Sequence, residues 1–69
     1  MEVGALLHIV RPVTAEQAAE VAEVERLEAE LLGLLANLAK HHPAGGREFA
    51  LAKTNLQQAR FWAIEGITA

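Results

Sequence analysis

Neutral hydrogen-bonding side chains crowd between two cations in the second half of the sequence. The string AKTNLQQARFW, residues 52–62, holds one hydroxyl, three carboxamides and an indole around Lys53 and Arg60. On a helix, Lys53, Gln57 and Arg60 step by four and three residues and share a face. Cations bind phosphate oxygens, while hydroxyls and carboxamides pair with nucleobase edges or ribose hydroxyls. The string therefore predicts a pocket for an anion that carries phosphate together with nucleobase or ribose groups. The alternative is a solvent-facing surface rich in helix formers.

Arg26 is a second candidate for binding an anion. It is the lone cation between residues 14 and 39, which also contain six glutamates. Glu23 at i−3 and Glu30 at i+4 are placed to hold it as a surface ion pair, and this is the alternative to ligand binding. Gly33 lies two turns along the same face and costs a helix about 1 kcal/mol relative to alanine. A ligand, a backbone or a tight helix crossing close by would explain that glycine.

Residues for catalysis or metal binding are scarce. The chain has no cysteine, serine or tyrosine, so disulfides are excluded and the commonest nucleophiles are missing. His8 lies far from the adjacent pair His41 and His42, and this spacing is not that of a metal site. The His pair instead suits a helix C-terminus. We therefore expect no enzyme, no cofactor and no metal.

Length and composition indicate a subunit of an assembly. A chain of 69 residues forms a marginal core, yet 52% of this one is hydrophobic, which favours oligomerisation. The net charge of −3 argues against binding to duplex nucleic acid. The apolar start MEVGALLHIV lacks the basic region of a signal peptide, and no apolar run approaches the roughly 18 residues of a membrane span. A soluble, intracellular protein without a membrane partner is expected.

The candidate residues belong to an expected hairpin, residues 14–67, that follows an N-terminal arm over residues 1–13. Thr14 with Gln17 three residues later has the pattern of a capping box, so the first helix is predicted over residues 14–41. Pro43 and the PAGG string predict a turn over residues 42–46, and the second helix follows over residues 47–66. The fold class is all-α, an antiparallel two-helix hairpin.

Apolar residues of both helices recur at coiled-coil spacing. The leucine seam of the first helix steps by 3, 4, 3 and 4, and consists of Val24, Leu27, Leu31, Leu34 and Leu38. Leu32 and Leu35 widen it into a face broad enough for two neighbours, which indicates a homo-oligomeric helical bundle. The second helix carries mostly small residues at this spacing, which let backbones approach closely: Phe49, Ala52, Leu56, Ala59, Ala63 and Gly66.

The order of these motifs resembles the phage anti-CBASS type 2 proteins, which are related to the hairpin domain of some anti-Thoeris sponges. VRPVTAEQ precedes a leucine-rich helix, and a short loop leads into AKTNLQQA with aromatics after it. The likeness is best over residues 49–67 and looser over residues 10–38. It implies a homo-oligomer, typically a hexamer in this family, in the cytoplasm of the infected bacterial host. It also implies binding and sequestration of cyclic di- or trinucleotide immune messengers without cleavage.

The same resemblance implies a set of ligand-binding residues. Arg26 matches a basic position that contacts phosphate, and Lys53 with Thr54 matches a cation–threonine pair. Where the family tends to carry a stacking aromatic, this chain has Val10. Trp62 or His8 would supply the stacking surface instead. The complete expected set is Arg26, Lys53, Thr54, Arg11, Gln57 and His8.

Two other interpretations stay open. The first is a structural or interaction module whose faces only bind protein chains, and the doubled leucine face favours it because that face requires nothing but packing. The second is a small regulator of nucleic acid, which the acidic first helix and the net charge disfavour.

Overall fold

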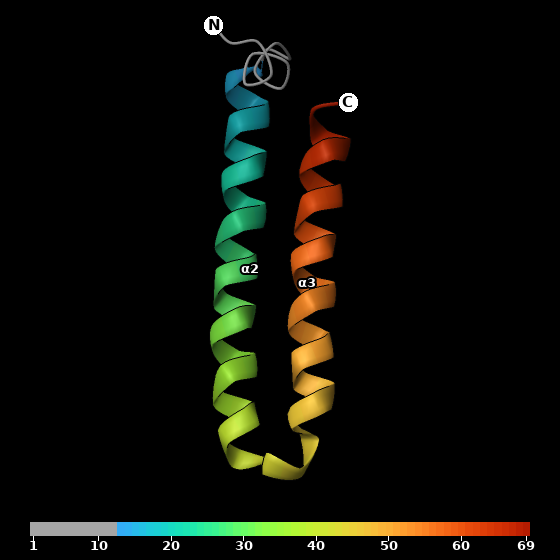
Figure 1. Cartoon of the computed structure of the whole chain (residues 1–69). Coiled ribbons are helices and arrows are strands. Elements are labelled where there is room, and N and C mark those ends of the chain that lie inside the picture. The colour runs from blue at the N-terminus through green and yellow to red at the C-terminus, as the bar shows by residue number, and fades with distance from the viewer. Residues whose placement is uncertain (1–12) are drawn as a thin grey trace, which may run out of the picture.

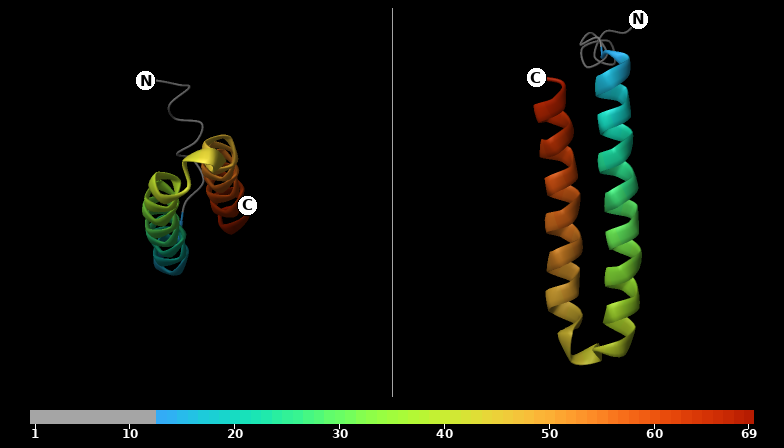
Figure 2. Two further views of the ribbon diagram at one scale, coloured as in Figure 1. Left: turned by 90° about the horizontal axis from the view of Figure 1, so that it is seen from below. Right: turned by 180° about the vertical axis from the view of Figure 1, so that it is seen from behind.

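Two long helices lie side by side and antiparallel in the computed structural model, which describes residues 13–69. Helix α2 spans Ala15–His41, the short 3₁₀ turn η1 spans Pro43–Gly45, and α3 spans Gly46–Ile67. The turn lies at one end of the molecule, and the C-terminus lies beside the start of α2 at the other (Figures 1 and 2). The described residues contain no β-strand, so the predicted all-α hairpin is confirmed. His8, Val10 and Arg11 lie outside the described residues.

A capping box begins α2, as the sequence predicts. The Thr14 amide donates to Gln17 Oε1 over 2.9 Å, and the Gln17 amide donates to Thr14 Oγ1 over 3.0 Å. These two bonds satisfy amides that have no partner within the helix. At the other end, the His42 amide donates to the Leu38 carbonyl, and Pro43 then begins the turn.

Gly45 allows the turn to pack tightly against α3. Its amide donates to the His42 carbonyl over 2.9 Å, which closes the turn. A Cβ at this position would lie 3.2 Å from Cε2 of Phe49, so a larger residue would push the ring away. The Phe49 ring in turn lies 6.3 Å from the His42 ring, and the two aromatics cover the turn together.

The contact between the helices consists of half-buried rows, and no described residue is fully buried. Two helices alone cannot enclose an interior, so each side chain between them keeps an exposed edge. The inward row of α2 includes Val21, Val24, Leu32, Leu35 and Leu38, and that of α3 includes Phe49, Ala52, Leu56, Ile64 and Ile67.

The leucine seam is only partly covered by α3. Val24 and Leu38 are half-buried, but Leu27, Leu31 and Leu34 remain 50%, 42% and 51% exposed. The predicted broad face therefore has one neighbour, α3, against its Leu32 flank, and an open side beyond it. Within the described residues, neither helix has the length and apolar character needed to cross a membrane.

The predicted small-residue row of α3 is wrong in its second half. Ala59, Ala63 and Gly66 are exposed, and the inward row continues through Arg60, Ile64 and Ile67. Longer side chains at these positions reach α2, whereas an alanine methyl leaves a gap. Within the described hairpin, no helix crossing explains Gly33, because a Cβ there would meet no heavy atom of these residues within 4 Å.

Candidate functional site

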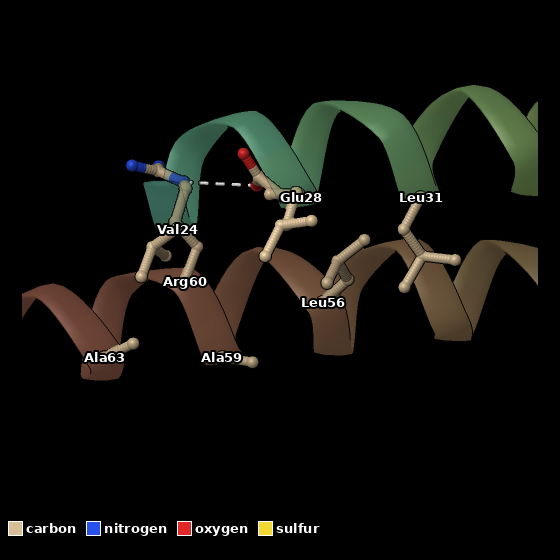
Figure 3. Close-up of a pocket in the computed structure, with 8 residues that line it drawn as sticks. Val24, Glu28, Leu31, Leu56, Ala59, Arg60 and Ala63 are labelled. Atoms are coloured by element: carbon tan, nitrogen blue, oxygen red, sulfur yellow. Dashed lines mark hydrogen bonds and ion pairs between the residues drawn. The ribbon is translucent and has the colours of Figure 1, made fainter. Parts of the chain in front are cut away.

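An open groove runs between the two helices along their middle turns. It encloses a volume of about 260 Å³, and six of its eight lining residues are apolar. The groove exists because Ala59 and Ala63 are too short to fill the space opposite the leucine seam. Figure 3 shows the side chains that line it, which are Val24, Leu27, Glu28, Leu31, Leu56, Ala59, Arg60 and Ala63.

An ion pair between the helices supplies the polar part of this groove. Arg60 Nε on α3 donates to Glu28 Oε2 on α2 over 3.1 Å. The Glu28 side chain is only 13% exposed and that of Arg60 is 37% exposed. Only Nε of the guanidinium takes part in this pair, so its two terminal nitrogens keep four N–H groups for other acceptors. In Figure 3 these nitrogens lie on the side away from Glu28.

Arg26 lies outside the groove and is held by glutamates of its own helix. Its Nε and one terminal nitrogen donate to Glu23 over 3.4 and 2.7 Å, and the other terminal nitrogen donates to Glu30 over 2.8 Å. The hydrogen bond to Glu23 and the charges of Glu23 and Glu30 raise the pKa of the guanidinium. The surface ion pairs considered from the sequence, with Glu23 and with Glu30, are therefore both present.

Lys53, Thr54 and Gln57 are exposed on α3 and do not line the groove. Lys53 and Gln57 continue the row of Arg60 toward the turn, as their spacing predicts. The Thr54 hydroxyl donates to the Ala50 carbonyl over 3.2 Å, which leaves its oxygen free to accept another hydrogen bond. Within one chain, the four predicted residues that the structure describes thus occupy two surfaces, one around Arg26 and one along α3.

A comparison with known protein families identifies the family of this hairpin. A family described as Acb2/Tad1, hairpin domain, matches residues 7–68. The chain belongs to the Acb2/Tad1 hairpin-domain family. The resemblance drawn from VRPVTAEQ and AKTNLQQA is therefore confirmed. No curated protein and no solved structure shows significant similarity to the chain.

In this Acb2/Tad1 hairpin, sequence analysis missed the pairing of Arg60 with Glu28. The two residues are 32 positions apart in the sequence. The spacing of Arg60 indicates only that it shares a helix face with Lys53. A signal was available, because Glu28 lies four residues after Val24 and four before Leu32, within the inward row of α2. A carboxylate at an inward position requires a partner on the opposite helix.

Two adjacent aromatics add exposed flat surface to the same Acb2/Tad1 hairpin. The Phe61 and Trp62 rings meet edge to face, with centroids 4.9 Å apart and planes at 80°. They are 49% and 64% exposed, so about half or more of each side chain stays uncovered within the described hairpin. Trp62 lies three residues after Ala59 and extends that side of α3.

Proposed function

We propose that this protein binds cyclic di- or trinucleotide immune messengers and sequesters them without cleavage, as a phage anti-defence sponge. Membership of the Acb2/Tad1 hairpin-domain family supports this role. The observation that carries the proposal is the apolar groove with a guanidinium fixed at its wall. A nucleotide offers both a flat apolar base and an anionic phosphate, and a groove of this composition accepts both.

The ligand contacts are divided by chemistry. Arg26, Lys53 and Arg60 neutralise phosphate, whereas the Thr54 hydroxyl and the Gln57 carboxamide pair with sugar or base edges. His8 and Arg11 complete the proposed set from the N-terminal arm. A cyclic dinucleotide has approximate twofold symmetry, so two copies of the chain present each cation twice and one of each kind per chain suffices.

Self-association completes the proposed site, with a hexamer as the proposed assembly. Leu27, Leu31 and Leu34 of α2 form an exposed apolar surface that another copy would cover. Charge supports pairing of unlike helices. On α2 six glutamates outnumber Arg26 and Lys40, whereas on α3 three cations slightly outnumber Glu48 and Glu65. Binding in such an assembly requires no nucleophile, so the proposed function is not enzymatic. Its proposed location is the host cytoplasm.

Thermal unfolding tests the proposal directly. Cyclic di-AMP or cyclic tri-AMP at high micromolar concentration should raise the Tm by several degrees, because a ligand bound only to the native state adds stability. The linear dinucleotide pApA and a short DNA duplex should give no comparable shift. Arg26→Ala, Lys53→Ala and Arg60→Ala should each reduce it. An unchanged Tm across a panel of cyclic oligonucleotides would contradict the proposal.

The second candidate function is a structural module that oligomerises or binds a protein partner only. The observation that favours it is the engagement of Arg26 by Glu23 and Glu30, which already neutralise this cation. The module predicts the same oligomer with no response to cyclic nucleotides. It also predicts that the protein tolerates substitution of Lys53 or Thr54, with the oligomer unchanged. The sponge, in contrast, requires both residues to bind its ligand.

A further inference from the structure

Glu28 occupies a position where stability alone does not explain a carboxylate. Its neighbours along the inward row, Val24 and Leu32, are aliphatic, and its own side chain is 13% exposed. Removing a carboxylate and a guanidinium from water costs about as much as their attraction returns, so aliphatic side chains of similar size stabilise such a position equally well or better. The pair therefore calls for a role other than holding the helices together.

The geometry of the pair points to that role. Glu28 Oε2 accepts from Arg60 Nε, which is the single N–H on the stem side of the guanidinium. The edge formed by the two terminal nitrogens makes no hydrogen bond to residues 13–69 and lies on the side away from Glu28 (Figure 3). A free arginine samples many rotamers, and fixing one of them in advance removes an entropic cost of binding.

We propose that Glu28 is a positioning residue, which holds the Arg60 guanidinium so that its terminal edge faces an anion bound at the groove. This inference rests on the proposed function, because it assigns the anion to a cyclic oligonucleotide phosphate. Glu28 itself does not touch the ligand. It acts through the 3.1 Å bond to Nε, and the remaining N–H pair binds two phosphate oxygens side by side.

The experiment separates positioning from fold stability by measuring affinity and Tm on the same variants. Calorimetric titrations use cyclic di-AMP and cyclic tri-AMP, and thermal unfolding is followed without ligand. Glu28→Met leaves Arg60 without its partner, but this side chain is 37% exposed and its guanidinium can turn toward water, so the Tm should fall by only a few degrees. It should weaken the affinity about tenfold, the effect of losing one well-oriented charged hydrogen bond.

The conservative variant provides the rescue. The amide oxygen of Glu28→Gln still accepts from Arg60 Nε, so its affinity should stay within about threefold of the wild type. Glu25→Met is the matched control, because it removes an exposed charge from the same helix and should leave the affinity unchanged. Should Glu28→Met not fold, Arg60→Lys tests the same point and should lose about tenfold, since an ammonium cannot hold Glu28 and offer a planar edge together.

The outcomes are distinguishable. If the wild type binds none of a panel of cyclic di- and trinucleotides that includes both probes, the proposed function fails and the positioning role fails with it. If the wild type binds and Glu28→Met, or Arg60→Lys in its place, binds equally well, the positioning role alone is overturned. A Glu28→Gln variant as weak as Glu28→Met would also overturn it, because the orienting acceptor would then not be what matters.

Discussion

Two arginines on this hairpin have opposite surroundings. Arg60 is fixed by one bond in a groove and keeps its terminal edge free, whereas all three nitrogens of Arg26 donate to glutamates on an exposed surface. The raised pKa of Arg26 keeps it charged at any working pH. Its stabilising effect would therefore fade only in strong alkali, as the pH rises through that pKa. A phosphate that binds Arg26 must therefore displace Glu23 and Glu30, and the protonation state of Arg26 does not limit its binding.

This competition predicts a gain of affinity. Glu23→Gln and Glu30→Gln should each strengthen binding of cyclic di-AMP by about threefold, because exposed pairs are weak but must be exchanged for phosphate contacts. Calorimetric titration at one ionic strength measures the change. Glu25→Gln carries the same charge change away from Arg26 and is the control. A gain that persists when Arg26→Ala is added would show that general charge, and not release of Arg26, is responsible.

Gly33 predicts a gain of stability. The position is open on the described hairpin, since a Cβ would meet no heavy atom within 4 Å. Gly33→Ala should therefore stabilise α2 by about 0.5–1 kcal/mol, and the reverse change Ala36→Gly should destabilise it by a similar amount. Urea unfolding of both variants measures this. A loss of stability in Gly33→Ala would reveal a neighbouring chain packed against the glycine.

At the scale of the helices, one side chain ties together the two ends that lie opposite the turn. The Gln17 Oε1 atom caps the start of α2, and Gln17 Nε2 donates to the Ile67 carbonyl at the end of α3 over 3.0 Å. One carboxamide thus satisfies backbone groups of both helices. At this open end, the bond from Gln17 links the two helices directly. The turn, which joins them covalently, lies at the other end (Figure 1).

Gln17→Glu separates these two functions. A carboxylate still accepts from the Thr14 amide but cannot donate to Ile67, so only the bond between the helices is lost. We expect a loss of about 1 kcal/mol and faster hydrogen exchange in the last turn of α3. Gln58→Glu, an exposed change on α3, is the control. Exchange at the end of α3 that matches the wild type would contradict the role of Gln17.

Local chemistry made much of this fold predictable. The capping box at Thr14, the stop at Pro43 and the spacing of the leucine seam each depend on nearby residues, and the sequence predicts them. Which flank of the seam α3 covers depends on how two helices cross, which neither helix determines alone. The pairing of Glu28 with Arg60 likewise depends on how the two helices cross.

At the scale of the whole molecule, the hairpin leaves a row of apolar side chains uncovered, and the proposed self-association rests on this row. Leu31→Lys should break the proposed oligomer into smaller species, since a charge on the exposed seam opposes burial against another copy. Ala29→Lys is the control, because it adds the same charge two residues from Leu31 and off the seam. Light scattering after gel filtration measures the mass. A monomeric wild type at working concentration would contradict self-association outright.

The most direct test of the central claim uses small molecules carried by the protein itself. The chain is expressed beside a bacterial cyclic-nucleotide synthase, purified, denatured, and the released solution is analysed by mass spectrometry. If the protein is a sponge, the wild type should release an intact cyclic di- or trinucleotide in stoichiometric amount per site, and Arg60→Ala far less. Released material that contains only linear products, or no nucleotide while the wild-type protein is folded and the synthase active, would contradict this proposal.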